Sequence, residues 1–600
     1  MPRISVREIK DNYDVIIVGS GAGGGQAAYT LAMEGVKILM LEAGRDYDPT
    51  TETPMFQENF RAPLRAVGTP DKPYGFYDAG VAGGWKMADE PYTMGEQDPT
   101  RHMMWFRTRM LGGRTNHWSR VALRMGPYDF KPYSRDGLGF DWPVSYEEIA
   151  PYYEKVETLI GVYGPEEELE NTPFGNKGVL LPPPPMRLAE RLAQARVKPL
   201  GIPVLPARRA VLSRRLDGEA IAQKLHPGNA KAQRILAESI AARAACFWAT
   251  PCERGCSIKA NYQSTTVHLP PALATGNLDL VTDAMVRSVT TNTAGRATGV
   301  IFVDKKTGRE ASASGRVVIL AASSYESVRI LFNSKTNQFA EGLGNSGGVL
   351  GRNLVNTVGT FGGGQVPMLE NMPPHNEDGA GGLHAYIPWW LYREQAAGKL
   401  GFARGYHIEF SGNRGMPPFG TGAGVASFSG VPYGAKLKAA ARRYYGSFIG
   451  FSGRGEMIPN KYCFCEIDPE VKDRWGIPVL RFHWKWSEHE IRQAEHMQQT
   501  FKQIIEAMGG VVTDLRPRSA EGAIQPGGRI IHEVGGAMMG VSPKTSVLNK
   551  WGQTWDVKNL YVLDGAAFCS SPDKNPTLTI MALAWRSAER IMDEMKRGEI

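Results

Sequence analysis

The sequence predicts an α/β fold with a mainly parallel first sheet and a second, antiparallel sheet covered by helices. The first observation is a strand–helix–strand pattern between Tyr13 and Glu42. The second is a series of β-rich runs in residues 278–324 that continues into a helix. The third is residues 356–508, where aromatic and β-branched runs precede a long helix. A chain of 600 residues is too long for one hydrophobic core, so we expect two or more domains.

Composition and charge exclude several classes of function. Hydrophobic residues make up 42% and charged residues 22% of the chain, as in ordinary globular proteins. The net charge of +8 is small for this length, and no basic block indicates nucleic-acid binding. No apolar stretch reaches the roughly 18 residues of a membrane span. The polar N-terminal segment lacks an apolar signal region, so we expect a cytoplasmic location, or a periplasmic or membrane-associated one if a partner subunit carries the chain out.

Three glycines in the first strand–helix–strand unit have the spacing of a dinucleotide-binding turn. The apolar run Val15–Val18 predicts a buried strand, and a helix is expected over Gln26–Glu34. Between them, Gly19 permits a tight turn, Gly21 allows the backbone to approach a pyrophosphate, and Gly24 allows close packing of helix on strand. The helix N-terminus offers free N–H groups and a positive dipole end to phosphates.

An acidic residue follows the second strand of this unit. The apolar run Val36–Leu41 predicts that strand, and Glu42 comes directly after it, at the usual distance from the first glycine. A carboxylate there accepts hydrogen bonds from a ribose diol, and its charge repels a 2′-phosphate. The strand, helix, glycines and acid together predict a Rossmann-like cofactor domain.

The remaining elements follow from local patterns. Helices are expected over Asp141–Gly161, Ser327–Asn333, Glu488–Met508 and Leu578–Arg597, with Ser145 and Glu148 as a capping box in the first. The β-rich runs in residues 281–323 predict a meander whose last strand rejoins the parallel sheet. A short strand is expected at Leu560–Asp564. Residues 46–102 are rich in Pro, Gly, Tyr and Asp and predict a long excursion over the surface or over a cofactor.

Four separated motifs resemble, in order, those of the glucose–methanol–choline (GMC) oxidoreductase family. They are GSGAGGG with Glu42, LGGRTNHW from Leu111, HEVGGAMMG from His532, and the segment Asn559–Ile591, which contains Asp564-Gly565 and Asn575-Pro576-Thr577. The resemblance implies an FAD-binding domain assembled from discontinuous segments and an antiparallel-sheet α+β substrate domain. The expected FAD-binding segments are residues 1–135, 226–345 and 526–600, and the expected substrate-domain segments are residues 136–225 and 346–525.

The family resemblance implies oxidation of a sugar or glycoside hydroxyl to a carbonyl, with hydride transfer to N5 of FAD. His532 matches the catalytic base of the family, and neutral histidine suits proton abstraction near neutral pH. Asn575 matches the residue that holds the substrate oxygen. The alternatives are a structural, hydrogen-bonded histidine at 532 and a helix N-cap at Asn575, before Pro576 at the first helical position.

Further cofactor contacts are also implied by the resemblance. Val286 matches the family's adenine contact, and an ordinary sheet valine is the alternative. His117 matches the position at which fungal pyranose oxidases link histidine covalently to the flavin, and a non-covalent flavin is the alternative. The complete set of expected cofactor-binding residues is Gly19, Gly21, Gly24, Glu42, Gly112, Gly113, Asn116, His117, Val286, Asp564 and Gly565.

Three cysteines, Cys246, Cys252 and Cys256, have the spacing C-x5-C-x3-C. The spacing resembles that in flavoprotein subunits of bacterial membrane-linked gluconate and fructose dehydrogenases, which work with a small subunit and a cytochrome. The resemblance implies a [3Fe-4S] cluster, because thiolates are the usual ligands of such clusters. Zinc is less favoured, because a structural zinc site uses four ligands, and three unliganded thiols remain an alternative.

Three other functions remain open from the sequence. A pyranose-oxidase-like enzyme would pass electrons to oxygen and produce H2O2, and a related enzyme would oxidise an alcohol that is not a sugar. An electron-relay subunit would bind the cofactors without oxidising a substrate. Aromatic residues in Tyr386–Tyr392 and Tyr406–Phe410 are candidates for stacking on sugar rings, and core packing explains them equally well.

Overall fold

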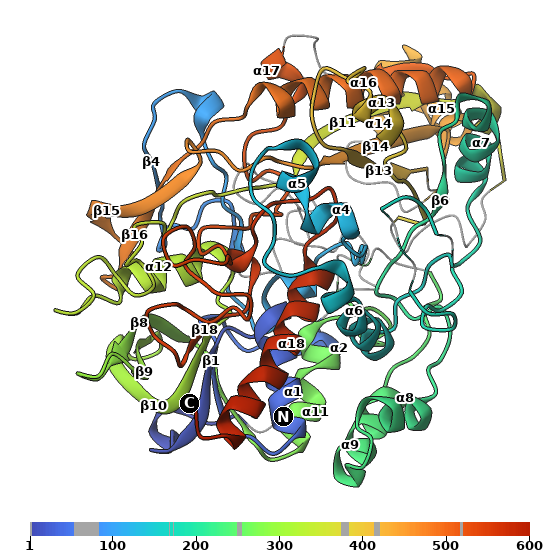
Figure 1. The fold of residues 1–600 in the computed structure, drawn as a ribbon. Helices are drawn as coiled ribbons and strands as arrows, with labels where there is room; N and C mark the ends of the chain where they lie inside the picture. Colours follow the sequence, from blue (N-terminus) through green and yellow to red (C-terminus); the bar gives the residue numbers. More distant parts are fainter. Residues whose placement is uncertain are drawn as a thin grey trace.

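The computed structural model describes residues 3–52, 83–166, 168–171, 173, 175–248, 252, 255–373, 383–412, 414, 421–515 and 520–600. Residues 53–82 of the predicted excursion therefore lie outside the described residues. The described part contains two large sheets, which occupy the lower and upper halves of Figure 1. No helix in this part has both the length and the apolar character needed to cross a membrane.

The first sheet combines strands from three stretches that are far apart in the sequence. Within the described residues it has seven strands in the order β7-β2-β1-β10-β9-β8, and β18 also pairs with β10. They are β1 (Tyr13–Val18), β2 (Ile38–Leu41), β7 (Leu278–Val281), β8 (Ala284–Thr291), β9 (Ala297–Asp304), β10 (Arg309–Leu320) and β18 (Leu560–Val562).

Strand β10 joins the predicted meander to the parallel part of this sheet. Its first half, from Arg309 to Ser314, pairs antiparallel with β9. Its second half, from Gly315 to Leu320, runs parallel to β1, and its last residues also run parallel to β18. The prediction that the meander's last strand rejoins the parallel sheet is confirmed, and one continuous strand does both.

Three helices pack together beside the parallel strands: α1 (Ala22–Met33), α11 (Leu269–Ala274) and α18 (Thr577–Lys596). Figure 1 shows α18 in red beside α1 in blue, so the C-terminal helix covers the first strand–helix unit. Helix α1 begins four residues before the predicted start, within the glycine motif itself, and its small residues are almost all buried. The cofactor turn and the helix N-terminus therefore form one continuous feature.

The second sheet is antiparallel and is covered by α16 (Glu488–Ala507). Within the described residues its order is β17-β11-β14-β13-β12-β6. The strands are β6 (Leu205–Pro206), β11 (Val358–Gln365), β12 (Ala385–Ile387), β13 (Tyr406–Ser411), β14 (Phe448–Gly455) and β17 (Val511–Asp514). Phe451 of β14 stacks on Phe501 of α16, with ring centroids 5.3 Å apart.

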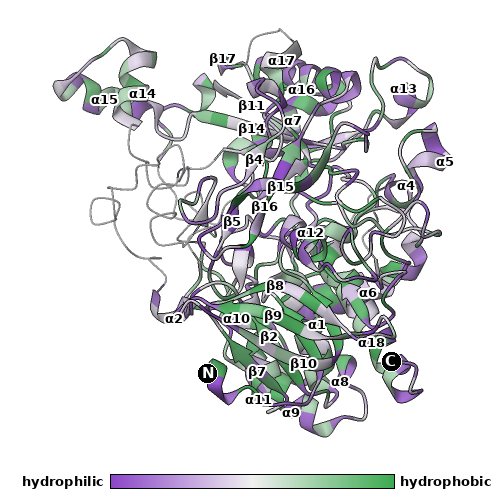
Figure 2. Cartoon of the chain, turned by 90° about the vertical axis from the view of Figure 1, so that its left-hand side faces the viewer, coloured by the Kyte–Doolittle hydropathy of each residue, from purple (hydrophilic) through white to green (hydrophobic). Residues whose placement is uncertain are grey.

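Shorter elements connect and cover the two sheets. The predicted capping box of α6 (Tyr146–Ile160) is confirmed, because Ser145 and Glu148 hydrogen-bond reciprocally. Helices α14 (Thr421–Ser429) and α15 (Gly434–Tyr444) project from the body in Figure 2. The remaining helices are α2 (Pro49–Glu52), α4 (Pro127–Phe130), α5 (Pro132–Asp136), α6 (Tyr146–Ile160), α7 (Leu188–Val197), α8 (Gly218–Leu225), α9 (Ala230–Ala241), α10 (Ser264–Val267), α12 (Ser324–Asn333), α13 (Tyr392–Ala396), α14 (Thr421–Ser429), α15 (Gly434–Tyr444) and α17 (Ala520–Ala523). The remaining strands are β3 (Gly83–Gly84), β4 (Thr93–Met94), β5 (Arg107–Thr108), β15 (Phe464–Lys472) and β16 (Pro478–His483), and the short 3-10 helices η5 (Gly113–Asn116) and η10 (Gly565–Ala567) border the site.

Candidate active site

A cavity of about 400 Å³ extends from the carboxyl ends of the parallel strands to the second sheet. Its walls include the ends of β1 and β2, the N-terminus of α1, η5, residues 530–533 and the start of α18. Strands β13 and β14 of the second sheet contribute Glu409 and Arg454. The cavity thus lies where dinucleotides bind in open parallel sheets, and it continues into the antiparallel part.

The three predicted glycines have three different surroundings. Gly19 has a φ of +98°, and a Cβ atom there would lie 2.3 Å from the carbonyl oxygen of Ala321. A Cβ atom on Gly24 would lie 2.0 Å from the carbonyl oxygen of Gly19, so this glycine allows the helix to approach the strand. A Cβ atom on Gly21 would have no heavy atom within 4 Å, and Gly21 lines the cavity. These surroundings fit a cofactor whose pyrophosphate lies against Gly21.

Glu42 is buried at the end of β2 and lines the cavity. One carboxylate oxygen accepts hydrogen bonds from the backbone N–H and the hydroxyl of Ser20, at 3.0 and 2.5 Å. The other accepts one from the backbone N–H of Gly44, at 2.7 Å. A carboxylate has about four acceptor positions, so one position is left for a ribose hydroxyl. The chemistry of this residue therefore fits the adenosine half of FAD.

Gly112 and Asn116 hold the loop of η5 in place. Gly112 donates its backbone N–H to the hydroxyl of Ser20 at 2.8 Å, and the amide of Asn116 donates to the carbonyl of Leu111 at 2.8 Å. Gly24, Gly112 and Asn116, also predicted as cofactor contacts, are not among the residues that line the cavity, and they shape the backbone beside it. Gly113, at the start of η5, lines the cavity.

His117 follows η5 and also lines the cavity. Its Nε2 lies 2.8 Å from the hydroxyl oxygen of Thr108. Burial, with the cations Arg120 and Arg114 nearby, lowers the pKa of His117 to about 3, so its imidazole is neutral.

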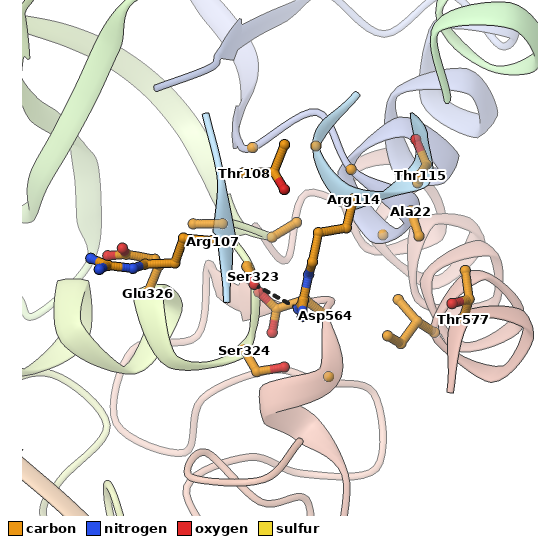
Figure 3. A pocket seen from close by; sticks show the side chains of 18 of the residues that line it. Ala22, Arg107, Thr108, Arg114, Thr115, Ser323, Ser324, Glu326, Asp564 and Thr577 are labelled. Carbon is orange, nitrogen blue, oxygen red and sulfur yellow. Dashed lines mark hydrogen bonds between the residues drawn. The ribbon is translucent and has the colours of Figure 1, made fainter. Parts of the chain in front are cut away.

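Arg114 connects two of the sequence motifs. It extends from η5 toward Ser323 and Asp564 in Figure 3, and it donates a hydrogen bond to the hydroxyl of Ser323 at 3.0 Å. Its other terminal nitrogen forms an ion pair with Glu533 at 2.5 Å. The LGGRTNHW and HEVGG motifs are therefore linked directly, although more than 400 residues separate these two side chains.

Asp564, Gly565 and Val286 line the cavity as well. The carboxylate of Asp564 accepts hydrogen bonds from the backbone N–H of Ala566 at 2.9 Å and from the hydroxyl of Ser327 at 2.5 Å. Burial raises the pKa of Asp564 to about 6. Asp564 thus shapes the start of η10 and also presents a polar group to the cavity.

The predicted catalytic pair meets in this cavity. The Nε2 of His532 lies 3.4 Å from Nδ2 of Asn575, and its Nδ1 lies 3.0 Å from the hydroxyl oxygen of Thr357. Burial, with the nearby Arg454 cation, lowers the pKa of His532 to about 3. The preceding residue, Ile531, has a φ of +61°, which is strained for a β-branched side chain and is typical of functional sites.

Asn575 is not an N-cap, so that alternative is wrong. The N-cap position of α18 is Pro576, and no side chain caps this helix. The amide of Asn575 instead donates a hydrogen bond to Glu409 at 3.3 Å. Its Oδ1 is buried without a hydrogen-bond partner. An unmade buried hydrogen bond costs about 1–3 kcal/mol, so a donor group on a bound molecule would relieve this cost.

Glu409 and Arg454 were not predicted from the sequence. They form an ion pair at 3.0 Å and lie on the cavity side of β13 and β14. Burial acts to raise the pKa of Glu409, but Arg454 and His407 outweigh burial and lower it, so the carboxylate is ionised. The alternation of apolar and polar residues in Tyr406–Ser411 is the sequence signal that separates the two faces of β13.

The aromatic residues of β13 do not contact the cavity, so the sugar-stacking hypothesis is wrong for them. Tyr406 and Phe410 are fully buried, and the hydroxyl of Tyr406 lies 2.8 Å from polar atoms of His496 and Thr500 on α16. They alternate with His407 and Glu409 and therefore point to the opposite face. Of Tyr386–Tyr392 and Tyr406–Phe410, Glu409 alone lines the cavity.

The three cysteines lie together, close to the loop of η5. Cys246 packs beside two small clusters, one with Cys252 and the other with Cys256, and burial raises the pKa of Cys246 to about 12. Among the described residues, no three His, Cys, Asp or Glu side chains are placed to hold a single metal ion. The buried guanidinium of Arg120 donates hydrogen bonds to the carbonyls of Cys252 at 2.7 Å and Asn116 at 2.8 Å. It therefore connects the cysteine segment to η5.

Comparisons with known proteins agree with this geometry. Residues 13–358 and 459–584 match the N-terminal and C-terminal models of the GMC oxidoreductases. The chain is 28% identical to 2-methyl-1,2-propanediol dehydrogenase of Mycolicibacterium austroafricanum, over 97% of this chain and 95% of that one. It is 26% identical to the fructose dehydrogenase large subunit of Gluconobacter japonicus, over 98% of both chains. A formate oxidase variant from Aspergillus oryzae shares the fold with a TM-score of 0.62 and 15% identity, over 98% of this chain and 99% of that one. The chain therefore belongs to the GMC oxidoreductase family and is an FAD-binding oxidoreductase that acts on CH–OH groups.

Proposed function

We propose that this enzyme oxidises a hydroxyl group of a sugar, glycoside or related polyol to a carbonyl. The observation that carries the proposal is the meeting of His532 and Asn575 in the same cavity that the glycine turn lines. A cofactor site alone would fit an electron-relay subunit. A neutral base that accepts the hydroxyl proton, beside an amide N–H that donates to the hydroxyl oxygen, fits a substrate hydroxyl.

The residues assign the proton transfer to one atom. When Nδ1–H of His532 donates to Thr357, the lone pair of Nε2 faces Asn575 and the cavity. The substrate hydroxyl donates its proton to this Nε2, and the amide of Asn575 holds the same oxygen. Because the pKa of His532 is lowered to about 3, the base is already neutral at ordinary pH. Gly21 and Glu42 would hold FAD, which would supply the hydride acceptor for this chemistry.

Anaerobic absorption spectra of the purified holoenzyme test the proposal. Addition of sugars and small polyols should bleach the flavin band of the wild type. His532→Ala should keep the band and lose the bleaching, whereas His483→Ala should behave as the wild type, since His483 pairs with Glu466 outside the cavity. Bleaching that survives in His532→Ala would contradict the role of this histidine and favour another base.

We further propose that a protein partner, rather than oxygen, accepts the electrons, through an iron–sulfur cluster on Cys246, Cys252 and Cys256. Two observations support it. Cys246 and Cys256 each accept a backbone N–H hydrogen bond at the sulfur, at 3.3 and 3.2 Å, and Arg120 links Cys252 to η5. A cluster takes one thiolate per iron, so its ligands need not converge on one point.

Iron and acid-labile sulfide analysis tests the cluster. Wild type should contain both, Cys252→Ser should lose them, and Cys463→Ser, which changes a buried cysteine elsewhere, should retain them. Stoichiometric H2O2 production with an iron-free protein would support the oxidase alternative. If the cluster is present, an electron-accepting subunit should copurify, and the location of the enzyme would follow that of the partner.

We also propose that His117 is bonded covalently to the flavin. The support is its position in the cavity lining and its neutral imidazole. Acid precipitation separates the two alternatives, because a covalent flavin stays with the protein pellet and a non-covalent flavin remains in the supernatant. His117→Ala should still bind the flavin when folded. On acid precipitation, its flavin should remain in the supernatant.

A further inference from the structure

Two charged residues of the second sheet, Glu409 and Arg454, lie beside the proposed catalytic pair. His407 and Arg454 are opposite one another in the register of β13 and β14, and Glu409 lies two residues further along β13. All three side chains therefore share one face of the sheet, away from α16. Glu409 and Arg454 line the cavity, and their side chains are 12% and 14% exposed.

The ion pair is within one hydrogen bond of the reacting position. The amide of Asn575 lies 3.4 Å from His532 and 3.3 Å from the carboxylate of Glu409. Neighbouring hydroxyl groups of a diol lie about as far apart as two hydrogen-bonded oxygens, roughly 2.8 Å. A substrate oxygen held by His532 and Asn575 therefore places the oxygen of the adjacent carbon at Glu409 and Arg454.

Hydrogen-bonding capacity remains at this position. The Nε of Arg454 and the Oδ1 of Asn575 are both buried without partners. Arg454 offers a donor and Glu409 an acceptor, which together match a hydroxyl group, because a hydroxyl both donates and accepts. A substrate that lacks the second hydroxyl leaves these buried groups unpaired, and that penalty is the basis of strong discrimination in enzyme sites.

Charged groups of both signs surround this position. Behind the ion pair, His407 lies between Glu409 and Asp573, at 3.7 and 3.6 Å. Lys574 lies 2.6 Å from Asp573 and 3.1 Å from Asp129. Acidic and basic groups alternate away from the cavity, so Glu409 and Arg454 compensate one another and neither is left to pair with an ion on the substrate.

We infer that Glu409 and Arg454 form a subsite for the hydroxyl adjacent to the oxidised one, so that the enzyme selects neutral vicinal diols. This inference rests on the proposed function, because it assigns the second hydroxyl of a substrate whose first hydroxyl reacts at His532. Glu409 and Arg454 would discriminate between substrates, although neither residue transfers the proton or the hydride.

A three-carbon substrate series tests the subsite in the holoenzyme. Anaerobic flavin bleaching is measured with propane-1,2-diol, propan-1-ol and propan-2-ol. The wild type should show a second-order rate constant for flavin reduction (the limiting reduction rate divided by the substrate Kd) at least 100-fold higher for the diol than for either mono-alcohol. Glu409→Gln should reduce this ratio to less than 10. Glu456→Gln is the matched control, because Glu456 is a buried carboxylate that pairs with Arg404 outside the cavity, and its ratio should remain that of the wild type.

Charged analogues separate recognition from a merely structural role of the ion pair. Glycerate carries a negative charge beside the diol, and 3-aminopropane-1,2-diol carries a positive one. Both should react at least 10-fold more slowly than propane-1,2-diol in the wild type. Glu409→Gln should improve glycerate relative to the amine, and Arg454→Gln should do the reverse, since each leaves one uncompensated charge. Structural damage would slow both analogues alike.

The outcomes distinguish this inference from the proposed function. Equal rates with the diol and the mono-alcohols in the wild type would overturn the diol subsite and leave alcohol oxidation intact. A diol preference that Glu409→Gln retains would overturn the assignment to Glu409. No bleaching by any of these alcohols, nor by sugars, would overturn the proposed function and the inference with it. Opposite shifts in charge preference in the two variants would support the subsite.

Discussion

Alanine at two glycines of the same turn should have opposite consequences for stability and cofactor binding. A methyl group on Gly24 would lie 2.0 Å from the carbonyl oxygen of Gly19, which is 1.4 Å short of an ordinary 3.4 Å contact. Helix α1 is buried between β1, α11 and α18 and has little room to retreat. Overpacking of this kind costs about 1–3 kcal/mol, so Gly24→Ala should lower the free energy of unfolding of the apoprotein by about that amount.

Gly21→Ala should leave the apoprotein as stable as the wild type. Its methyl group would meet no protein atom within 4 Å, because it points into the cavity. In the holoenzyme, the same space belongs to the pyrophosphate if the cofactor binds as proposed. We expect the FAD dissociation constant to rise at least about 100-fold, which corresponds to about 2.8 kcal/mol.

Two measurements separate these effects. Denaturant unfolding of the apoproteins gives the stability, and titration with FAD, followed by flavin fluorescence, gives the affinity. FAD affinity of Gly21→Ala within threefold of the wild type would refute the placement of the pyrophosphate at this turn. A Gly24→Ala apoprotein with wild-type stability would refute the close packing of helix on strand.

Three further predictions concern the histidines. His532→Ala should slow anaerobic flavin bleaching by about 10²–10⁴-fold at unchanged FAD content, as expected for loss of a general base; a smaller loss in stopped-flow experiments would contradict this. Because the pKa of His532 is lowered to about 3 and the neutral form is active, the bleaching rate should stay constant as the pH falls from about 7 to 5. Loss of Arg454 should raise that pKa, so the rate should begin to fall at a higher pH than in the wild type. A wild-type rate that already falls near pH 6.5 would show a different base. Burial keeps the pKa of His117, His268, His384 and His532 below the value in the unfolded chain, so the unfolded state binds more protons at acidic pH. As the pH decreases from about 6.5, the free energy of unfolding should therefore decrease, by up to about 1.4 kcal/mol per pH unit for each of these histidines. Denaturant unfolding at two pH values should show that the free energy of unfolding falls less per pH unit in His268→Gln than in the wild type. An equal fall in the two proteins would contradict the assignment.

The helices and strands near the cofactor could be predicted because their signals are local. The strand before Gly19, the helix after it and the acid at Glu42 all fall within about 30 residues, and each has a characteristic residue pattern. The capping box of α6 is local in the same way. The boundary of α1 was wrong by four residues, because glycines weaken a helical pattern even where tertiary packing stabilises the helix.

The sequence by itself predicted the dinucleotide turn and the acid that follows it and, through the family resemblance, the histidine and asparagine of the proposed catalytic pair. It did not distinguish a cap from a substrate ligand at Asn575, since both uses suit the same local pattern. Only the tertiary structure excluded the cap, because Pro576 holds the N-cap position and the amide of Asn575 donates to Glu409 of another sheet. Likewise, the alternation along β13 separates its two faces, but only the packing of α16 decides which face is core and which lines the cavity. The substrate end of the site depends on contacts between segments hundreds of residues apart, and local patterns contain no information about such contacts.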